Sequence, residues 1–305
     1  VINWFKAQDV HTENFLSKLP NQEHIATQIR SYYLKDNSAY SKVKHANNGF
    51  VFFLKVNNKN SIQKLFYRTS SNSNDIELFD PTAFQKELNI EYNINYIQPS
   101  WNGNHVLVSL SYDGITGSSL VIIDVLNKKL LPEIITNAEP DSYLGISWLP
   151  DSSGFLYLYI PELDSKNKNY MLNSSTVLHK LGDNPNKRHI VFSSASSSQI
   201  TNEDLPIAKI LSKNDKYLIG YKASVENYWS AYYAKISDLD KAIIEWKPFY
   251  TTDEKIYADY GYFIENEFVF ISGKEADNRT ISSFNVNTKT PINQNVLVPE
   301  KKYEV

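Results

Sequence analysis

SWLPDSSGFLYLYIP, from Ser147 to Pro161, changes abruptly from a turn to an apolar run. A tryptophan and the turn-forming residues Pro-Asp-Ser-Ser-Gly lead directly into five apolar residues, Phe155 to Tyr159. A β-strand with one solvent-exposed face alternates apolar and polar residues, whereas a strand covered on both faces does not. This stretch therefore predicts a strand that is buried on both sides and follows a tight turn.

The same arrangement recurs along the chain, first in SWNGNHVLVSL, Ser100 to Leu110. Intervals of 54, 51, 61 and 51 residues separate the equivalent turn positions, which are Gly49, Gly103, Gly154, Asp215 and Asn266. Repeats of roughly 40–50 residues with about four strands each are typical of β-propeller blades. The sequence thus predicts a mainly β protein with about five blades over residues 46–305, and no sixth blade begins clearly after Val286. A five-bladed ring and part of a larger propeller both remain open.

The propeller interpretation also predicts where large residues pack. Stacked sheets cover both faces of their inner strands, so Phe50–Leu54, Val106–Val108 and Phe155–Tyr159 are the expected inner strands. Trp101 and Trp148 each lie just before a predicted turn. We expect both to pack between blades, because tryptophan buries a large area at a repeated position.

The N-terminal region has a different period. Apolar residues recur every three or four positions from Asn3 to Leu19, which predicts a helix that Pro20 ends. A second segment with the same period follows Asn21, a suitable N-cap residue. We therefore expect two amphipathic helices over residues 1 to about 35, and divide the chain into a helical segment, 1–45, and a propeller segment, 46–305.

Composition excludes several classes of protein. The 305 residues carry a net charge of −3, which gives no electrostatic signature of a nucleic-acid or anionic-membrane partner. No apolar run reaches the roughly 20 residues that span a bilayer, so we expect a soluble protein without a membrane segment. The absence of cysteine excludes disulfides and thiolate chemistry but does not assign a compartment, so cytoplasmic, periplasmic and secreted locations stay open.

Catalytic motifs are absent from the sequence. A nucleophile elbow needs glycine two residues before and two after the serine, yet GISWL at Gly145–Leu149 and GSSLV at Gly117–Val121 both lack the second glycine. No two histidines have the HExxH spacing of a helical zinc site, and no phosphate loop or dinucleotide fingerprint is present. We expect His105 and His179 to be ordinary strand residues, and we predict no catalytic residue, metal or cofactor in this chain.

Carboxylates are frequent in the predicted turns, namely at Asp113, Asp124, Asp141, Asp151 and Asp164. Five-bladed glycosidases place paired acids around a central channel, so this activity remains an alternative. The simpler interpretation is that aspartate is a good turn residue.

A family likeness emerges from the order of these stretches. The stretches are WFKAQDVHTENFLSKLP at Trp4–Pro20, the blade sequences SWNGNHVLVSLSYDG, ISWLPDSSGFLYLYIPE and ILSKNDKYLIGYKASVENYWSAYYAKI, and NVLVPEKKYEV at Asn295–Val305. Together they resemble the prolyl oligopeptidase family of serine peptidases. The likeness runs the whole length of the chain and rests on pattern and order, with no single invariant motif.

The resemblance implies a fold and a function for a longer protein. Members of this family place a seven-bladed propeller over an α/β-hydrolase domain that carries the whole Ser-Asp-His triad, with the N-terminal helices packed on the hydrolase domain. About five of the seven blades are present here. The implied partners are the C-terminal hydrolase domain and, in the full-length enzyme, short proline-containing peptides. The implied reaction is cleavage after proline.

Three hypotheses follow. The chain is the N-terminal and propeller portion of such a peptidase, gates access of short peptides, and is inactive alone; its substrate-binding residues are not identified by any motif. Alternatively, it is a stand-alone five-bladed propeller that binds a protein or peptide, or a five-bladed glycosidase. An incomplete ring would also leave blade faces exposed, which favours self-association.

Overall fold

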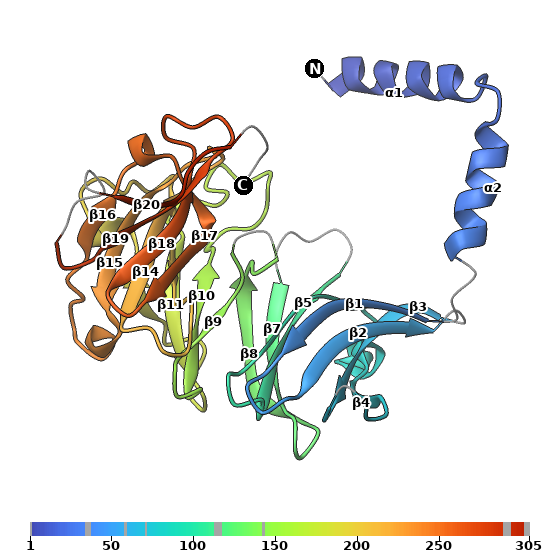
Figure 1. Cartoon of the computed structure of the whole chain (residues 1–305). Helices are drawn as coiled ribbons and strands as arrows, with labels where there is room; N and C mark the ends of the chain where they lie inside the picture. Colours follow the sequence, from blue (N-terminus) through green and yellow to red (C-terminus); the bar gives the residue numbers. More distant parts are fainter. Residues whose placement is uncertain are drawn as a thin grey trace.

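A computed structural model describes residues 2–33, 38–57, 60–70, 72–112, 118–141, 144–288 and 294–301. Two helices, α1 (Ile2–Leu16) and α2 (Gln22–Tyr33), precede a region that is otherwise β-structure (Figure 1). The backbone N–H of Ile25 donates to the carbonyl of Asn21 at the start of α2, and Pro20 lies between the helices. The two helices expected within residues 1–35 are confirmed.

The described residues contain twenty strands and five single-turn 3₁₀ helices. In chain order they are β1 Ser38–His45, β2 Val51–Asn57, β3 Asn60–Arg68, β4 Ile76–Phe79, η1 Pro81–Ala83, η2 Lys86–Leu88, β5 Asn93–Pro99, β6 His105–Ser111, β7 Ser118–Asp124, β8 Lys129–Ala138, β9 Ser147–Trp148, β10 Gly154–Tyr159, β11 Ser175–Lys180, β12 His189–Phe192, η3 Ser194–Ser196, β13 Leu205–Lys209, β14 Tyr217–Ala223, β15 Ser230–Lys235, η4 Ile236–Asp238, β16 Lys247–Tyr250, η5 Thr252–Glu254, β17 Ile256–Ile264, β18 Glu267–Ser272, β19 Thr280–Asn285 and β20 Asn295–Val298.

The strands form five antiparallel four-stranded units, β1–β4, β5–β8, β9–β12, β13–β16 and β17–β20, which we call units 1 to 5. Within each unit, every strand pairs with the next one along the chain, and among the described residues only the joint between units 2 and 3 has a pairing that links two units. There, a single pairing of Tyr159 with Ala138 links β10 to β8, so the two units share one hydrogen-bonded sheet. The five expected propeller blades are therefore present.

The first sheet begins earlier than expected. β1 pairs with β2 from Ser38 to His45, so a whole strand of unit 1 lies inside the range 1–45 that was assigned to the helical segment. The boundary at residue 45 was wrong because β1 lacks the apolar run of the later strands. Its residues Tyr40, Lys42 and Val43 are exposed, and an exposed strand leaves little hydrophobic signal.

Burial on both faces explains the apolar runs. In β10, Phe155 and Tyr157 pack into a core cluster with Leu107 and Leu120 of unit 2, while Leu156 packs into a second cluster with Leu218 of unit 4. Alternate side chains of one strand thus fill two different interfaces. The prediction of two-sided burial is confirmed for this strand.

The two tryptophans before the turns hold units 2 and 3 together, as expected. The indole N–H of Trp101 donates to the carbonyl of Trp148 at 3.0 Å, and the indole N–H of Trp148 donates to the carbonyl of Gln98 at 3.1 Å. Trp148 is only 1% exposed and packs edge-on against Phe155, with ring centroids 5.2 Å apart. These contacts keep β5 and β9 side by side.

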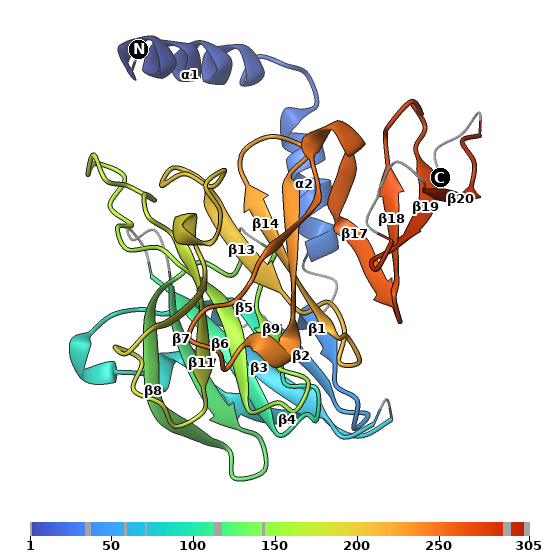
Figure 2. The same cartoon turned by 90° about the vertical axis from the view of Figure 1, so that its left-hand side faces the viewer.

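Buried clusters connect the units in series. Within the described ranges, such clusters join units 1 and 2, 2 and 3, 3 and 4, and 4 and 5, whereas no strand pairing or buried cluster joins unit 5 to unit 1. Figures 1 and 2 show the same order as a curved row of sheets, with the helices extending away from it. The described strands therefore stack without closing a five-membered ring.

Candidate functional site

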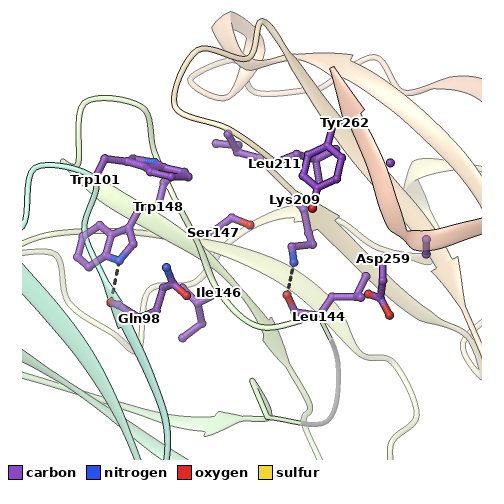
Figure 3. A pocket seen from close by; sticks show the side chains of 13 residues that line it. Gln98, Trp101, Leu144, Ile146, Ser147, Trp148, Lys209, Leu211, Asp259 and Tyr262 are labelled. Atoms are coloured by element: carbon purple, nitrogen blue, oxygen red, sulfur yellow. Dashed lines mark hydrogen bonds between the residues drawn. The ribbon is translucent and has the colours of Figure 1, made fainter. Parts of the chain in front are cut away.

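A cavity lies where the first strands of units 2 to 5 converge (Figure 3). Its volume is about 200 Å³. The lining residues come from β5, β9, β13 and β17 and from the segments next to them: Gln98, Trp101, Leu144, Ile146, Ser147, Trp148, Lys209, Ile210, Leu211, Ala258, Asp259, Gly261 and Tyr262. The fold thus brings together side chains from four repeats that lie about 50 residues apart in sequence.

Lys209 supplies the positive charge of this cavity. It ends β13, a strand whose other four residues are buried, and its ammonium donates to the carbonyl of Leu144. Burial lowers the pKa of Lys209 to about 8, with Asp259 acting to raise the pKa and Lys44 acting to lower it. A pKa near 8 leaves the amine mostly protonated at neutral pH.

A glycine and a tyrosine fix the segment that presents the carbonyl of Leu144. Gly145 has a φ of +73°, and a Cβ added to it would lie 2.3 Å from the hydroxyl of Tyr96. That hydroxyl accepts a hydrogen bond from the N–H of Ile146 at 3.1 Å and donates to Oε1 of Gln98 at 3.0 Å. Burial raises the pKa of Tyr96 to about 12, so it stays a neutral donor. Only glycine suits both this backbone conformation and this close approach.

Strand β1 brings further charges near the same region. The Nζ of Lys42 lies 2.7 Å from a carboxylate oxygen of Asp141, an ion pair that joins unit 1 to the segment before β9. The Nζ of Lys44 lies 5.8 Å from the ring centroid of Tyr96. Both lysines therefore have a partner, as Lys209 has in the carbonyl of Leu144.

The residues that line the cavity are suited to binding a ligand. Its lining offers one ammonium, one carboxylate, an amide, hydroxyls and apolar walls, and no histidine is among the lining residues. Ser147 lies there but is 4% exposed and has no histidine beside it in the cavity to act as a base. The elbow-like GISWL is thus part of the cavity wall, while Gly117 of GSSLV lies outside the described residues.

Histidines do not converge on a reactive site. His105 in β6 and His179 in β11 are strand residues, as expected, and burial lowers the pKa of each, opposed in part by Glu133. Across the described part of the chain, no group of three or more His, Cys, Asp or Glu side chains is placed to hold a metal ion. No described helix is long and apolar enough to cross a membrane.

The turn carboxylates act locally. Asp124, Asp151 and Asp164 each accept a backbone N–H from a residue two or three positions later, which confirms the interpretation of these three as turn residues. Asp141 pairs with Lys42, and Asp113 lies outside the described residues. Among the described residues, Asp259 is the one acid that lines the cavity. The convergent acids that a glycosidase requires are therefore not formed by the described residues, and that alternative is not supported.

No motif in the sequence marks Lys209, Asp259, Gln98 or Tyr262. One signal was present, because Lys209 interrupts the otherwise apolar stretch Leu205–Leu211. Lysine is seldom placed in a buried strand without a reason. The other three belong to first strands, which carry no recurring motif.

Comparisons with known proteins give a family match and several similar solved structures. Residues 1–305 match the family described as the prolyl oligopeptidase N-terminal β-propeller domain. Among solved structures, a prolyl endopeptidase from a study of inter-domain dynamics in catalysis and specificity superposes with a TM-score of 0.71 at 19% identity, covering 99% of this chain. Prolyl oligopeptidase B from Galerina marginata superposes with a TM-score of 0.71 as the apo protein and 0.73 when bound to a 35mer hydrolysis and macrocyclization substrate, at 16% identity and 98% coverage in both cases.

These similarities establish the fold, and the matched region is less than half of each solved protein. The chain spans 42% of the prolyl endopeptidase and 43% of each of the two prolyl oligopeptidase B structures. A search of curated proteins found no match.

Proposed function

Because the chain belongs to the family of prolyl oligopeptidase N-terminal β-propeller domains, we propose that it is the N-terminal and propeller part of a serine endopeptidase that cleaves short peptides after proline. The family match over residues 1–305 carries this proposal. In it, this part gates access of peptides to a catalytic triad that lies in a C-terminal α/β-hydrolase domain, and this chain alone is inactive.

The exposed face of unit 5 supports the presence of further blades. Phe268 to Ile271 is an uninterrupted apolar run, yet Val269 and Ile271 are only half-buried, and Ile264 on the same face is 61% exposed. A run of this kind is the pattern of a strand covered on both sides. Another sheet packed on this face would bury these side chains.

The N-terminal helices support a second partner surface. Helix α1 has no buried residue, and it exposes large apolar side chains, including Trp4, Phe5 and Phe15. Figure 1 shows both helices extending away from the sheets. So many exposed large apolar side chains on one helix are typical of an interaction site. The hydrolase domain is the partner we propose for it.

The cavity wall supports the gating role. The first strands of four units line one cavity of about 200 Å³, which is far too small to admit a folded protein. Separation of blades or domains would then be needed for larger substrates.

The test uses the protein produced from the whole coding sequence, compared with this 305-residue chain. We expect the whole protein to release a fluorophore from succinyl-Gly-Pro-aminomethylcoumarin, to ignore the alanine analogue, and to leave folded proteins intact. This chain alone should release none. A stop codon directly after Val305, or equal cleavage of the alanine and proline substrates, would reject the proposal.

The stand-alone binding module requires a closed five-bladed ring. Across the residues described, no hydrogen-bonded pairing connects β1–β4 with β17–β20. This alternative therefore has no structural support.

A further inference from the structure

We propose that the cavity beside Lys209 is a subsite for the free α-carboxylate of a short peptide whose last residue is apolar or carries a ring such as that of proline. This inference rests on the proposed function, because hydrolysis of any peptide bond leaves one fragment with a new α-carboxylate.

The charge of the cavity selects a monoanion. Within the described residues, Lys209 forms no ion pair, and its one hydrogen bond is donated to the carbonyl of Leu144. An ammonium has three donors, so two remain for a ligand. Asp259 lines the same cavity (Figure 3), and its carboxylate would repel a dianion such as phosphate more strongly than a monoanion. A carboxylate bound at Lys209 instead leaves Asp259 free to accept a peptide N–H.

The shape of the cavity suits the end of a peptide. About 200 Å³ is below the roughly 300–1,000 Å³ of pockets that enclose a drug-sized ligand. Its walls include Trp101 and Leu211, which are half-buried and offer a flat and an aliphatic surface. Apolar walls would contact the terminal side chain while Lys209 holds the carboxylate.

We expect the affinity of this site for a carboxylate to depend on pH. Burial keeps the pKa of Lys209 near 8, with Asp259 raising the pKa and Lys44 lowering it. A bound carboxylate favours the protonated amine, so it must raise this pKa further. By linkage, affinity for the carboxylate falls as the pH rises past about 8, where the free site loses its proton.

The experiment measures binding to this chain by titration calorimetry. The probe is acetyl-Ala-Ala-Pro with a free carboxylate, and the reference probe is the same peptide with a C-terminal amide. We expect the acid to bind about tenfold tighter than the amide at pH 7, since a charged hydrogen bond is lost with the amide. Raising the pH from about 7 to about 9.5 should weaken only the acid.

Variants assign the effect to one side chain. Lys209→Met should reduce the preference for the acid to within about twofold, and Lys209→Arg should keep most of it. Lys213→Met is the matched control, because Lys213 is an exposed lysine in the loop after β13 and should leave the preference unchanged. Thermal unfolding of each variant checks that it is folded.

Equal binding of acid and amide, no binding of either probe, or a preference that survives Lys209→Met would overturn the subsite. The result is independent of the test of the proposed function. Preference for the acid without proline-specific cleavage by the whole protein would retain the subsite and reject the peptidase. Cleavage without that preference would do the reverse.

Discussion

Strands β10 and β18 occupy the same place in their units but differ in burial. In β10 the five residues from Gly154 to Leu158 are all buried, whereas in β18 buried and half-buried residues alternate from Glu267 to Ser272. Both sequences are apolar throughout their centres. The difference lies in the neighbours, because unit 3 is packed between units 2 and 4, and unit 5 is packed only against unit 4. A continuous apolar run thus indicates a strand suited to packing against a sheet on each side, whether or not both sheets are present.

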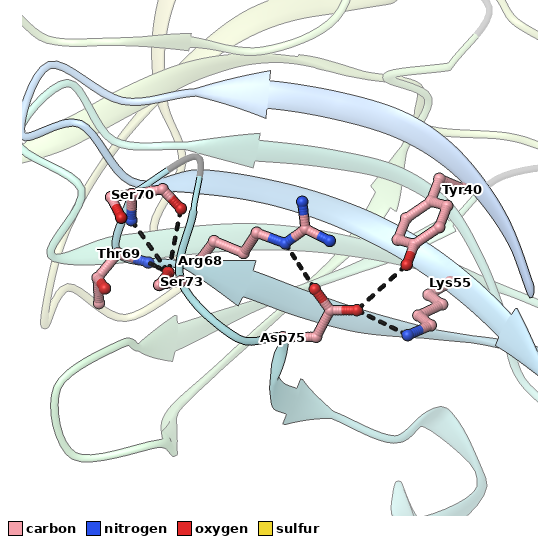
Figure 4. Close-up of polar contacts among 7 residues, drawn as sticks. All are labelled: Tyr40, Lys55, Arg68, Thr69, Ser70, Ser73 and Asp75. Atoms are coloured by element: carbon pink, nitrogen blue, oxygen red, sulfur yellow. Dashed lines mark hydrogen bonds and ion pairs between the residues drawn. The ribbon is translucent and has the colours of Figure 1, made fainter.

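Unit 1 also has one face without a neighbouring sheet, but side chains of unit 1 itself cover that face (Figure 4). Phe53 is 2% exposed although it lies outside the core cluster shared with unit 2, since Tyr40, Phe66 and the guanidinium of Arg68 pack over it. Asp75 accepts from Lys55 and from Arg68, each at 2.6 Å. The two ends of the row therefore differ, because one is covered by an ion-pair network and the other exposes aliphatic side chains.

Removing a core side chain tests the difference between units 3 and 5 most strongly. Leu156→Ala in β10 should lower the free energy of unfolding by about 3 kcal/mol, because it leaves a cavity between two packed units. Ile271→Ala in β18 should cost about 1 kcal/mol or less, since its side chain is already partly exposed to solvent. Urea unfolding followed by tryptophan fluorescence measures both.

Two results would contradict this comparison. Equal losses for the two variants would mean that the outer face of unit 5 is covered in solution. A small loss for Leu156→Ala would mean that units 3 and 4 are loosely packed. Dilution of the Ile271→Ala variant separates the first case from self-association, since only an association-dependent loss changes with protein concentration.

The ion-pair network of unit 1 should have a smaller effect. Burial acts to raise the pKa of Asp75, but hydrogen bonds from Lys55 and Arg68 outweigh burial and lower the pKa. Asp75→Asn should therefore cost about 1 kcal/mol at pH 7, allowing for the partial exposure of the group. Asp240→Asn is the control, because the Lys180–Asp240 pair is more exposed and should contribute less than about 0.5 kcal/mol.

The pH dependence of this contribution has a defined sign. A carboxylate with a lowered pKa in the folded state stabilises the fold above its unfolded pKa of about 3.9, and the stabilisation is lost as the pH falls through the folded value. The advantage of the natural chain over Asp75→Asn should thus hold from pH 7 to about pH 4 and shrink below it. An advantage that grows on acidification would show that the network does not stabilise the fold through the ionised form.

How far the sequence predicts this fold depends on the strand. Second strands such as Phe155–Tyr159 carry a local signal, because two-sided burial demands a continuous apolar run. The first strands of units 1 and 3 do not. β1 exposes Tyr40 and Val43, and β9 consists of only Ser147 and Trp148, so neither has a detectable period. The number of units was therefore predictable, whereas the start of unit 1 was not.

The cavity was not predictable for the same reason. Gln98, Ser147, Lys209 and Asp259 come from four first strands, and their proximity depends on how the units stack. No spacing rule connects residues that converge through four successive sheets. Gly145 illustrates the point, since its role is set by the hydroxyl of Tyr96, a residue of the preceding unit.

The smallest effect on stability should come from the exposed face of unit 5, where association is the informative readout. Ile264 shares this face with Val269 and is 61% exposed, so Ile264→Lys should change the free energy of unfolding by less than about 0.5 kcal/mol. We expect the natural chain to self-associate as its concentration rises, because exposed apolar faces of stacked sheets pair with one another. Ile264→Lys should shift this association to higher concentration in sedimentation velocity.

The control for that variant is Val225→Lys, which adds the same charge at a fully exposed residue in the loop between β14 and β15 of unit 4. It should associate like the natural chain, because a single exposed aliphatic residue contributes little to an interface. A natural chain that sediments as a compact monomer at every concentration would show that the open face of unit 5 is not adhesive. Units 1 and 5 would then differ in how their outer faces are packed but not in their tendency to associate.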